Sequence, residues 1–184
     1  MSVLHTLIST KAMALAELYQ DTPTWPAGTT FTDSDITVGQ QSLTSLAAER
    51  GTPCVLIAPS GARQPGEEYR TVVVATVLSC TPRAGWRHPM DVTIDCDLRA
   101  LDGRVLDTLL LQHPNARHRK TVLVHAPGQQ TTIRAWLPET AAPGDLLALT
   151  VAGTIALGQV MSHPTRPATG EDDDEQWQGR CLKK

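Results

Sequence analysis

Short apolar runs separated by turn residues are the feature that most constrains this chain, and they begin near residue 69. Residues 71–80 (TVVVATVLSC) are apolar and largely β-branched, which is typical of a central strand buried on both faces. Residues 91–99 alternate instead, so one face is apolar and the other polar. The apolar members are Val92, Ile94, Cys96 and Leu98, and the polar members expected to face solvent are Asp95, Asp97 and Arg99. The fold predicted from these patterns is mainly β.

Further strands follow in the same style. Asp102-Gly103 is a strong hairpin signal, so residues 104–112 are expected to return as the partner of 91–99. Residues 121–125 and 131–137 form a second expected pair. Residues 146–151 and 154–160, interrupted by Gly153, complete a set of five to seven strands over residues 69–162. The 13 glycines and 13 prolines suit such a series of short strands and turns.

The two ends of the chain differ from this β region. Residues 2–20 show helical spacing of leucines, a second helix is expected at about 40–50 with Gly51 as terminator, and 54–58 reads as a short strand. We therefore expect residues 1–68 to be a helical extension packed on or beside the barrel. Beyond residue 163 periodicity is lost and five acidic residues occupy 171–175, which predicts a disordered acidic tail over 163–184.

Composition narrows the classes of function. The net charge is −3, and outside the acidic run the chain is mildly basic, well short of a dedicated duplex-DNA binder. Neither a signal peptide nor a membrane-spanning stretch is recognisable, and the four cysteines form no CxxC pair, so a cytoplasmic protein with free thiols is expected. The sequence shows no phosphate loop, GxSxG, HExxH or zinc spacing, so we expect no cofactor, no metal and no enzyme activity. The alternative of an enzyme would rest on Cys54 or Cys80 as nucleophile and on His88, His113, His118 or His125 as base.

One segment carries a resemblance. Residues 143–154 (PGDLLALTVAGT), preceded by 132–137 (TIRAWL), resemble the last strands of bacterial single-stranded-DNA-binding proteins and their primosomal relatives, in which a Gly-Asp or Gly-Ser turn enters a strand that ends in glycine. The resemblance covers about 70–160 and implies an OB-like Greek-key barrel. This chain departs from the family in having few aromatic residues, in lacking an apolar tip on its acidic tail, and in its first 68 residues.

Candidate binding residues fall into three groups. The expected loop at 81–89 places one aromatic ring among cations, and in an OB barrel it would be one of the loops that clasp oligonucleotides. A second basic cluster follows at 117–120, and an outward Trp lies beside an Arg on the strand at 131–137. The candidate residues are Arg83, Trp86, Arg87 and His88, then Arg117, Arg119 and Lys120, then Arg134 and Trp136. The alternatives are a Trp86 that closes the barrel end, a solvated turn at 117–120, and a Trp136 in a subunit interface or covered by the N-terminal helix.

These residues predict a non-catalytic accessory protein that binds single-stranded nucleic acid in replication or in a mobile element. Arginine and lysine would neutralise phosphates while Trp86 or Trp136 stacks on bases. The acidic run 171–175 would compete for the basic groove or recruit a basic protein partner, and a homo-oligomer is expected. The alternative is a phage-type structural or assembly protein that acts through β-rich oligomeric interfaces.

Overall fold

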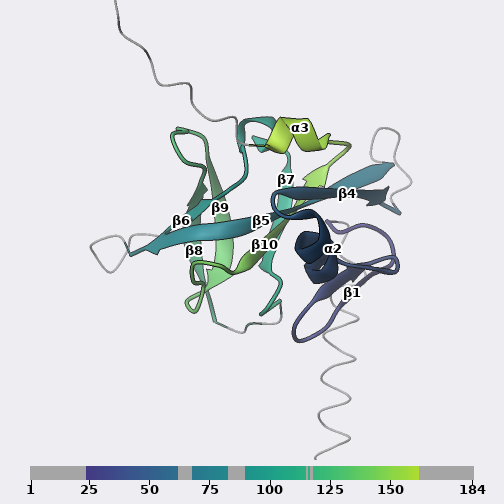
Figure 1. The fold of residues 1–184 in the computed structure, drawn as a ribbon, viewed down its shortest axis with the longest axis horizontal. Coiled ribbons are helices and arrows are strands. Elements are labelled where there is room, and N and C mark those ends of the chain that lie inside the picture. The colour runs from purple at the N-terminus through teal and green to yellow at the C-terminus, as the bar shows by residue number, and fades with distance from the viewer. Residues whose placement is uncertain (1–23, 62–67, 83–89, 115, 117, 162–184) are drawn as a thin grey trace, which may run out of the picture.

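A computed structural model of the chain describes residues 24–61, 68–82, 90–114, 116 and 118–161. Over these ranges the fold is mainly β, with few short helices (Figure 1). The strands are β1 (Thr29–Phe31), β2 (Ile36–Val38), β3 (Gln41–Ser42), β4 (Cys54–Pro59), β5 (Tyr69–Thr81), β6 (Met90–Ile94), β7 (Val105–Leu110), β8 (Arg119–His125), β9 (Thr132–Pro138) and β10 (Leu146–Ala152). The helices are α2 (Leu43–Arg50), the 3₁₀ turn η1 (Arg99–Leu101) and α3 (Leu157–Val160).

A nearly closed, barrel-like sheet dominates the described part of the chain. Six strands follow one another in the order β7-β10-β5-β6-β8-β9, and the two ends of this path, β7 and β9, contact each other. The sheet is mixed, because β6 and β8 run parallel while the other pairs on the path are antiparallel. β4 pairs with β5 beside this path, and β1, β2 and β3 form a separate small sheet.

β5 lies at the centre of the molecule and is buried on both faces, as its sequence predicts. Val73, Ala75 and Val77 belong to the cluster inside the barrel, whereas Val72 and Val74 belong to a second cluster on the outside. A strand that alternates between two cores needs apolar residues at every position, and this explains the unbroken TVVVATV run. The same strand therefore joins the two hydrophobic cores.

The second core lies beneath residues 24–59. Trp25 is 2% exposed, its indole Nε1 donates to the carboxylate of Asp107 on β7 at 2.8 Å, and its ring packs edge-on against Phe31. The helix expected at 40–50 is present as α2, and Gly51 ends it with a φ of +74°. Around it, 24–59 forms strands rather than further helix, and β4 joins the large sheet. The helix expected at 2–20 and the acidic tail lie outside the described residues.

The single strand expected over 91–99 is wrong beyond Ile94. All four apolar side chains of that alternation are fully buried, yet β6 ends at Ile94. Asp97 is only 3% exposed, because its carboxylate accepts hydrogen bonds from the backbone N–H and the guanidinium of Arg99 and so turns the chain into η1. Asp95 is half-buried and accepts from the backbone N–H of Thr76 at 2.8 Å and from the hydroxyl of Thr52. The expectation that these carboxylates face solvent is therefore wrong.

Two more parts of the sequence prediction, one strand pairing and one strand, are wrong. Asp102-Gly103 does form a turn, but β7 pairs with β10 and not with the 91–99 segment. Residues 154–160 form no strand, because the chain turns at Gly153 and then enters α3. The antiparallel pair β8–β9 and the strand β10 confirm the expectations for 121–125, 131–137 and 146–151.

Candidate nucleic-acid interface

The candidate residues divide into those that the structure describes and those that it does not. Arg83, Trp86, Arg87, His88 and Arg117 lie outside the described residues. Arg119 and Lys120 begin β8, and Arg134 and Trp136 lie on β9.

Parallel pairing of β6 and β8 brings the described residues that flank the two basic segments to one end of the sheet. The 82–89 connection leaves β5 at Thr81, which is paired with Asp91 near the start of β6. The 111–118 connection leads into the start of β8, and parallel strands begin at the same end of a sheet. The sequence did not predict this pairing.

Trp136 ends an exposed row on the outer face of β9. Thr132, Arg134 and Trp136 are exposed, whereas the intervening Ile133, Ala135 and Leu137 are buried in the barrel. Trp136 is 61% exposed, the largest fraction among the large hydrophobic side chains of the described residues. Its partner across the ladder is Thr121, and Leu123 lies opposite Arg134. A small and a medium side chain next to the ring leave its face open for stacking.

The two cationic side chains at the start of β8 already have polar partners within the chain. The Lys120 ammonium lies 2.6 Å from the Glu139 carboxylate, with both side chains exposed. Arg119 donates from its guanidinium to the carbonyl oxygens of Ala116 and Pro114, so it braces the connection that precedes β8. Lys120 can exchange the exposed Glu139 carboxylate for a phosphate at little cost in free energy. Arg119 would first have to break its hydrogen bonds to the carbonyl oxygens of Ala116 and Pro114.

His125 and Asp91 lie on the same outer face and join the two parallel strands. The imidazole Nε2 of His125 is 3.0 Å from a carboxylate oxygen of Asp91, and each side chain is 25% exposed. His125 therefore has a partner on the outer face of the sheet. Asp91 was missed in the sequence because its role depends on the parallel register.

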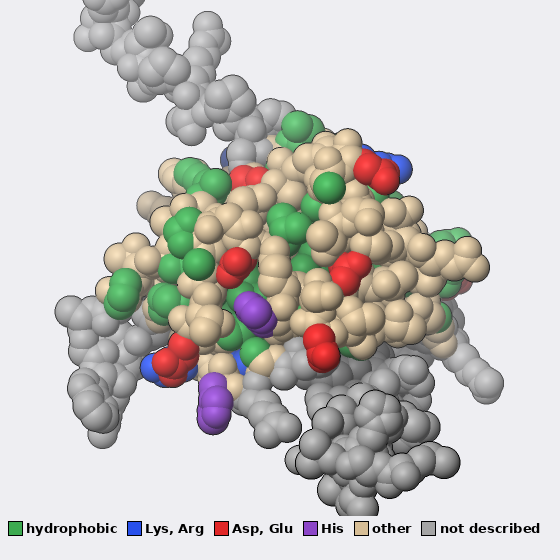
Figure 2. All heavy atoms as spheres, turned by 60° about the horizontal axis from the view of Figure 1, so that its bottom comes forward, with side chains coloured by type: hydrophobic (Ala, Val, Ile, Leu, Met, Phe, Trp, Pro, Cys, Tyr) green, Lys and Arg blue, Asp and Glu red, His purple; other side chains and the backbone are tan. Residues whose placement is uncertain are grey.

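Positive charge is scattered over one face of the described part of the chain. On the face drawn in Figure 2 the few Lys and Arg side chains lie apart, and acidic side chains stand among them. A binding face here would rely on stacking and on a few phosphate contacts more than on a broad basic tract.

The described cysteines favour the thiol form at neutral pH. Burial raises the pKa of Cys54 and Cys80, and burial together with the carboxylates of Asp95 and Asp97 raises that of Cys96 to about 12. Because the thiolate is the nucleophile, these environments do not activate sulfur. Within the described ranges no three His, Cys, Asp or Glu side chains are grouped to hold a metal ion, and no helix is long and apolar enough to span a membrane.

Comparison with protein-family models gives no match, and comparison with curated proteins gives none either. The outer face of β8 and β9, with the connections that lead into β6 and β8, is therefore assigned as the candidate interface on its geometry alone.

Proposed function

We propose that this protein binds single-stranded nucleic acid, without catalysis, on the outer face of β8 and β9. The observation that carries the proposal is the 61% exposure of Trp136 beside the exposed Arg134, at the end of the sheet where both basic connections begin. An exposed indole is costly to leave in water unless a partner covers it, and every nucleobase offers a face to it.

In this mechanism one base stacks on Trp136 while Arg134 contacts a neighbouring phosphate. Arg83, Arg87, Arg117 and Lys120 extend the phosphate track from the two connections, and Trp86 supplies a second stacking surface. The acidic run 171–175 competes for the same cations or recruits a basic protein. This role suits an accessory factor of replication or of a mobile element, acting in the cytoplasm.

We further propose that the barrel is a variant of the OB architecture. Three features support this relation: a nearly closed mixed sheet, a long strand β5 shared by several partners, and a Gly-Asp turn into β10. The additional strand β7 extends the sheet beyond the five strands of the minimal fold.

The test is fluorescence anisotropy with labelled oligo-dT at low and at moderate salt. We expect binding that weakens with salt. We expect Trp136→Ala to weaken it roughly 5- to 150-fold, because stacking on an aromatic side chain contributes about 1–3 kcal/mol per base. Tyr69→Ala is the matched control, since Tyr69 is an exposed aromatic residue, at 47%, on β5 away from the β8–β9 face. Arg87→Ala is expected to weaken binding as well. Absence of binding, or equal effects of the two aromatic substitutions, would contradict the proposal.

A second candidate is a phage-type structural or assembly protein that works through β-rich contacts between copies. The exposed apolar side chains Ile57 and Leu157, each 45% exposed, favour it. A ring-like oligomer on sizing, together with no affinity for oligo-dT, would select this function over the first.

A further inference from the structure

Among the described residues, β4 pairs with β5 on one edge and with no strand on the other. The backbone N–H of Ser60 donates to the carbonyl of Glu68, and in the antiparallel register this sets Ala58, Leu56 and Cys54 as the residues that bond to β5. The N–H and C=O groups of the alternate residues, Val55 and Ile57, therefore point away from the sheet. At the end of this edge the carbonyl of Pro59 accepts a hydrogen bond from the N–H of Ala27. Within the described part of the chain, it is the only outward backbone group of β4 with a backbone partner.

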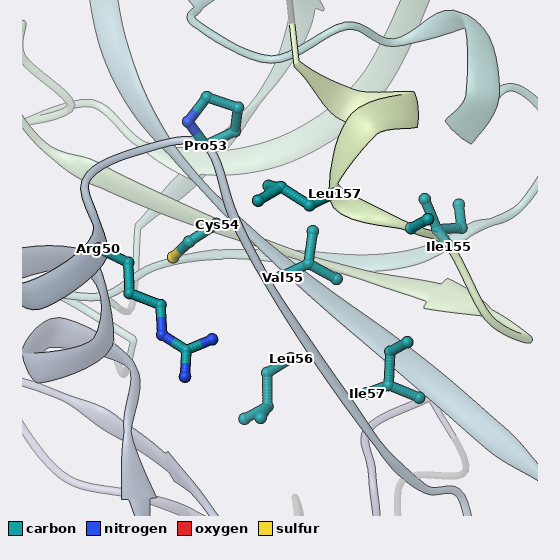
Figure 3. A pocket seen from close by; sticks show the side chains of 9 residues that line it. Arg50, Pro53, Cys54, Val55, Leu56, Ile57, Ile155 and Leu157 are labelled. Atoms are coloured by element: carbon teal, nitrogen blue, oxygen red, sulfur yellow. The ribbon is translucent and has the colours of Figure 1, made fainter.

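An apolar groove runs along this open edge. Its volume is about 290 Å³, and it is lined by β4 residues and by 155–157 from the segment that leads into α3. Val55 and Ile57 point toward Ile155 and Leu157 on one side of β4, while Cys54 and Leu56 point to the other side, where Arg50 lies (Figure 3).

Exposed apolar side chains gather around the groove. Ile57 and Leu157 line it, and Tyr69, 47% exposed, follows on the same face of the sheet because it pairs with Pro59 two residues from Ile57. Such a cluster next to unpaired backbone groups is the arrangement that recruits another strand.

We propose that this edge pairs with the β4 edge of a second copy of the chain, in an antiparallel arrangement centred on Leu56. Val55 of each copy then stands opposite Ile57 of the other, and each such pair exchanges two backbone hydrogen bonds. The outward N–H and C=O groups of Val55 and Ile57 are all satisfied in this register, and Ile57 and Leu157 are covered. The two sheets become continuous across the dimer.

A second copy fits the edge better than an arbitrary strand for two reasons. The segment from Cys54 to Pro59 carries no charge and is bounded by Pro53 and Pro59, so the pairing stops at the same residues on both copies. Arg50 lines the groove and the exposed Glu49 precedes it in α2, so these two charges cancel and two copies approach without net repulsion.

The interface is small, so the dimer forms in a concentration-dependent equilibrium. It lies on β4, away from the outer face of β8 and β9 (Figure 1), and does not depend on nucleic-acid binding.

Sedimentation velocity of the full chain over about 1–200 μM, a range that spans weak protein association, tests the dimer. We expect the sedimentation coefficient to rise with concentration, and Ile57→Lys to raise the dissociation constant at least about tenfold, because a lysine on an edge strand blocks pairing. Leu78→Lys is the matched control, since Leu78 is 46% exposed and lies outside the groove, and it should leave the equilibrium unchanged. A wild-type chain that stays monomeric over the range, or equal effects of the two lysines, would overturn the proposal.

Two further measurements separate backbone pairing from simple apolar contact. Ile57→Pro removes one outward N–H while leaving the bonds of β4 to β5 intact, so it should abolish the dimer without altering the far-UV circular dichroism. Amide exchange followed by NMR should show protection of Val55 and Ile57 that increases with protein concentration. Protection independent of concentration would mean that the chain's own residues occupy the edge, and would refute the dimer.

Discussion

At the scale of single residues, Asp35 organises the junction between β2 and α2. Its carboxylate accepts hydrogen bonds from the backbone N–H groups of Ile36 and Thr44, at 2.8 and 3.1 Å, and from the hydroxyls of Thr44 and Ser42. Spacing rules for helix caps look at most a few residues upstream of the helix, whereas Asp35 reaches Thr44 from nine residues away. The helix was predictable from its apolar face, but this cap was not.

Asp35→Ala is expected to reduce the free energy of unfolding by about 1–2 kcal/mol, because the backbone N–H groups of Ile36 and Thr44 lose their carboxylate acceptor. Burial raises the pKa of Asp35, but the hydrogen bonds from Ser42 and Thr44 outweigh it and lower the pKa below the ordinary 3.8. The stabilisation is therefore complete above pH 3.8 and is lost as the pH falls through the lower folded-state value. Urea unfolding of both proteins over a pH series measures this difference.

The matched control is Asp102→Ala, which removes an exposed carboxylate at the end of η1. It should change the unfolding free energy by less than about 0.5 kcal/mol at any pH, as most surface substitutions do. A difference between wild type and Asp35→Ala that stays constant on acidification would show that the carboxylate charge is not what stabilises the junction.

At the scale of elements, local pattern predicted the strands better than it predicted their partners. β5, β8, β9 and β10 lie where the apolar runs placed them. The Asp102-Gly103 signal gave a turn but the wrong pairing, because β7 finds its partner β10 more than thirty residues later in the chain. Strand pairing over such separations depends on the shared core, and a hairpin rule sees only adjacent residues.

The two glycines of the PGDLLALTVAG segment both adopt a positive φ, which explains why glycine occupies these positions. Gly144 has a φ of +93°, and its N–H donates to the carbonyl of Val77, while the Asp145 carbonyl accepts from the Val77 N–H. The turn is thus fastened to β5 near its register shift. Gly153, with a φ of +74°, ends β10 and donates to Tyr69.

Gly144→Ala is expected to destabilise the fold by about 1–2 kcal/mol, because an L side chain rarely adopts that backbone conformation. A Cβ at this position meets no atom within 4 Å, so the loss would come from the backbone alone. Gly158→Ala is the control: its Cβ also meets nothing within 4 Å, and alanine favours the helical conformation of α3. Thermal unfolding compares the two, and equal midpoints would exclude strain at Gly144.

At the scale of the whole molecule, sequence reasoning reached the exposed row on β9 but not the arrangement around it. Strict alternation was enough to place Arg134 and Trp136 outward. The convergence of both basic connections at one end requires the parallel β6–β8 pair, and the open edge of β4 requires knowing that β10 takes the other side of β5. Both are properties of the sheet order, which no single segment encodes.

The two cores share β5, so we expect them to unfold together, and Cys96 inside the barrel can report that event. Cys96 is fully buried with a pKa raised to about 12, whereas Cys80 is only partly buried. A thiol reagent at neutral pH should therefore modify Cys96 only through global unfolding, orders of magnitude more slowly than Cys80, as mass spectrometry of the labelled peptides can measure. Leu43→Ala removes a fully buried side chain of the second core and should cost about 2–5 kcal/mol. If the two cores unfold together, this substitution accelerates labelling of Cys96 by about 30-fold or more. If Cys96 reacts as fast as Cys80 in the folded protein, or if Leu43→Ala leaves its rate unchanged, the barrel opens locally and the two cores are not one cooperative unit.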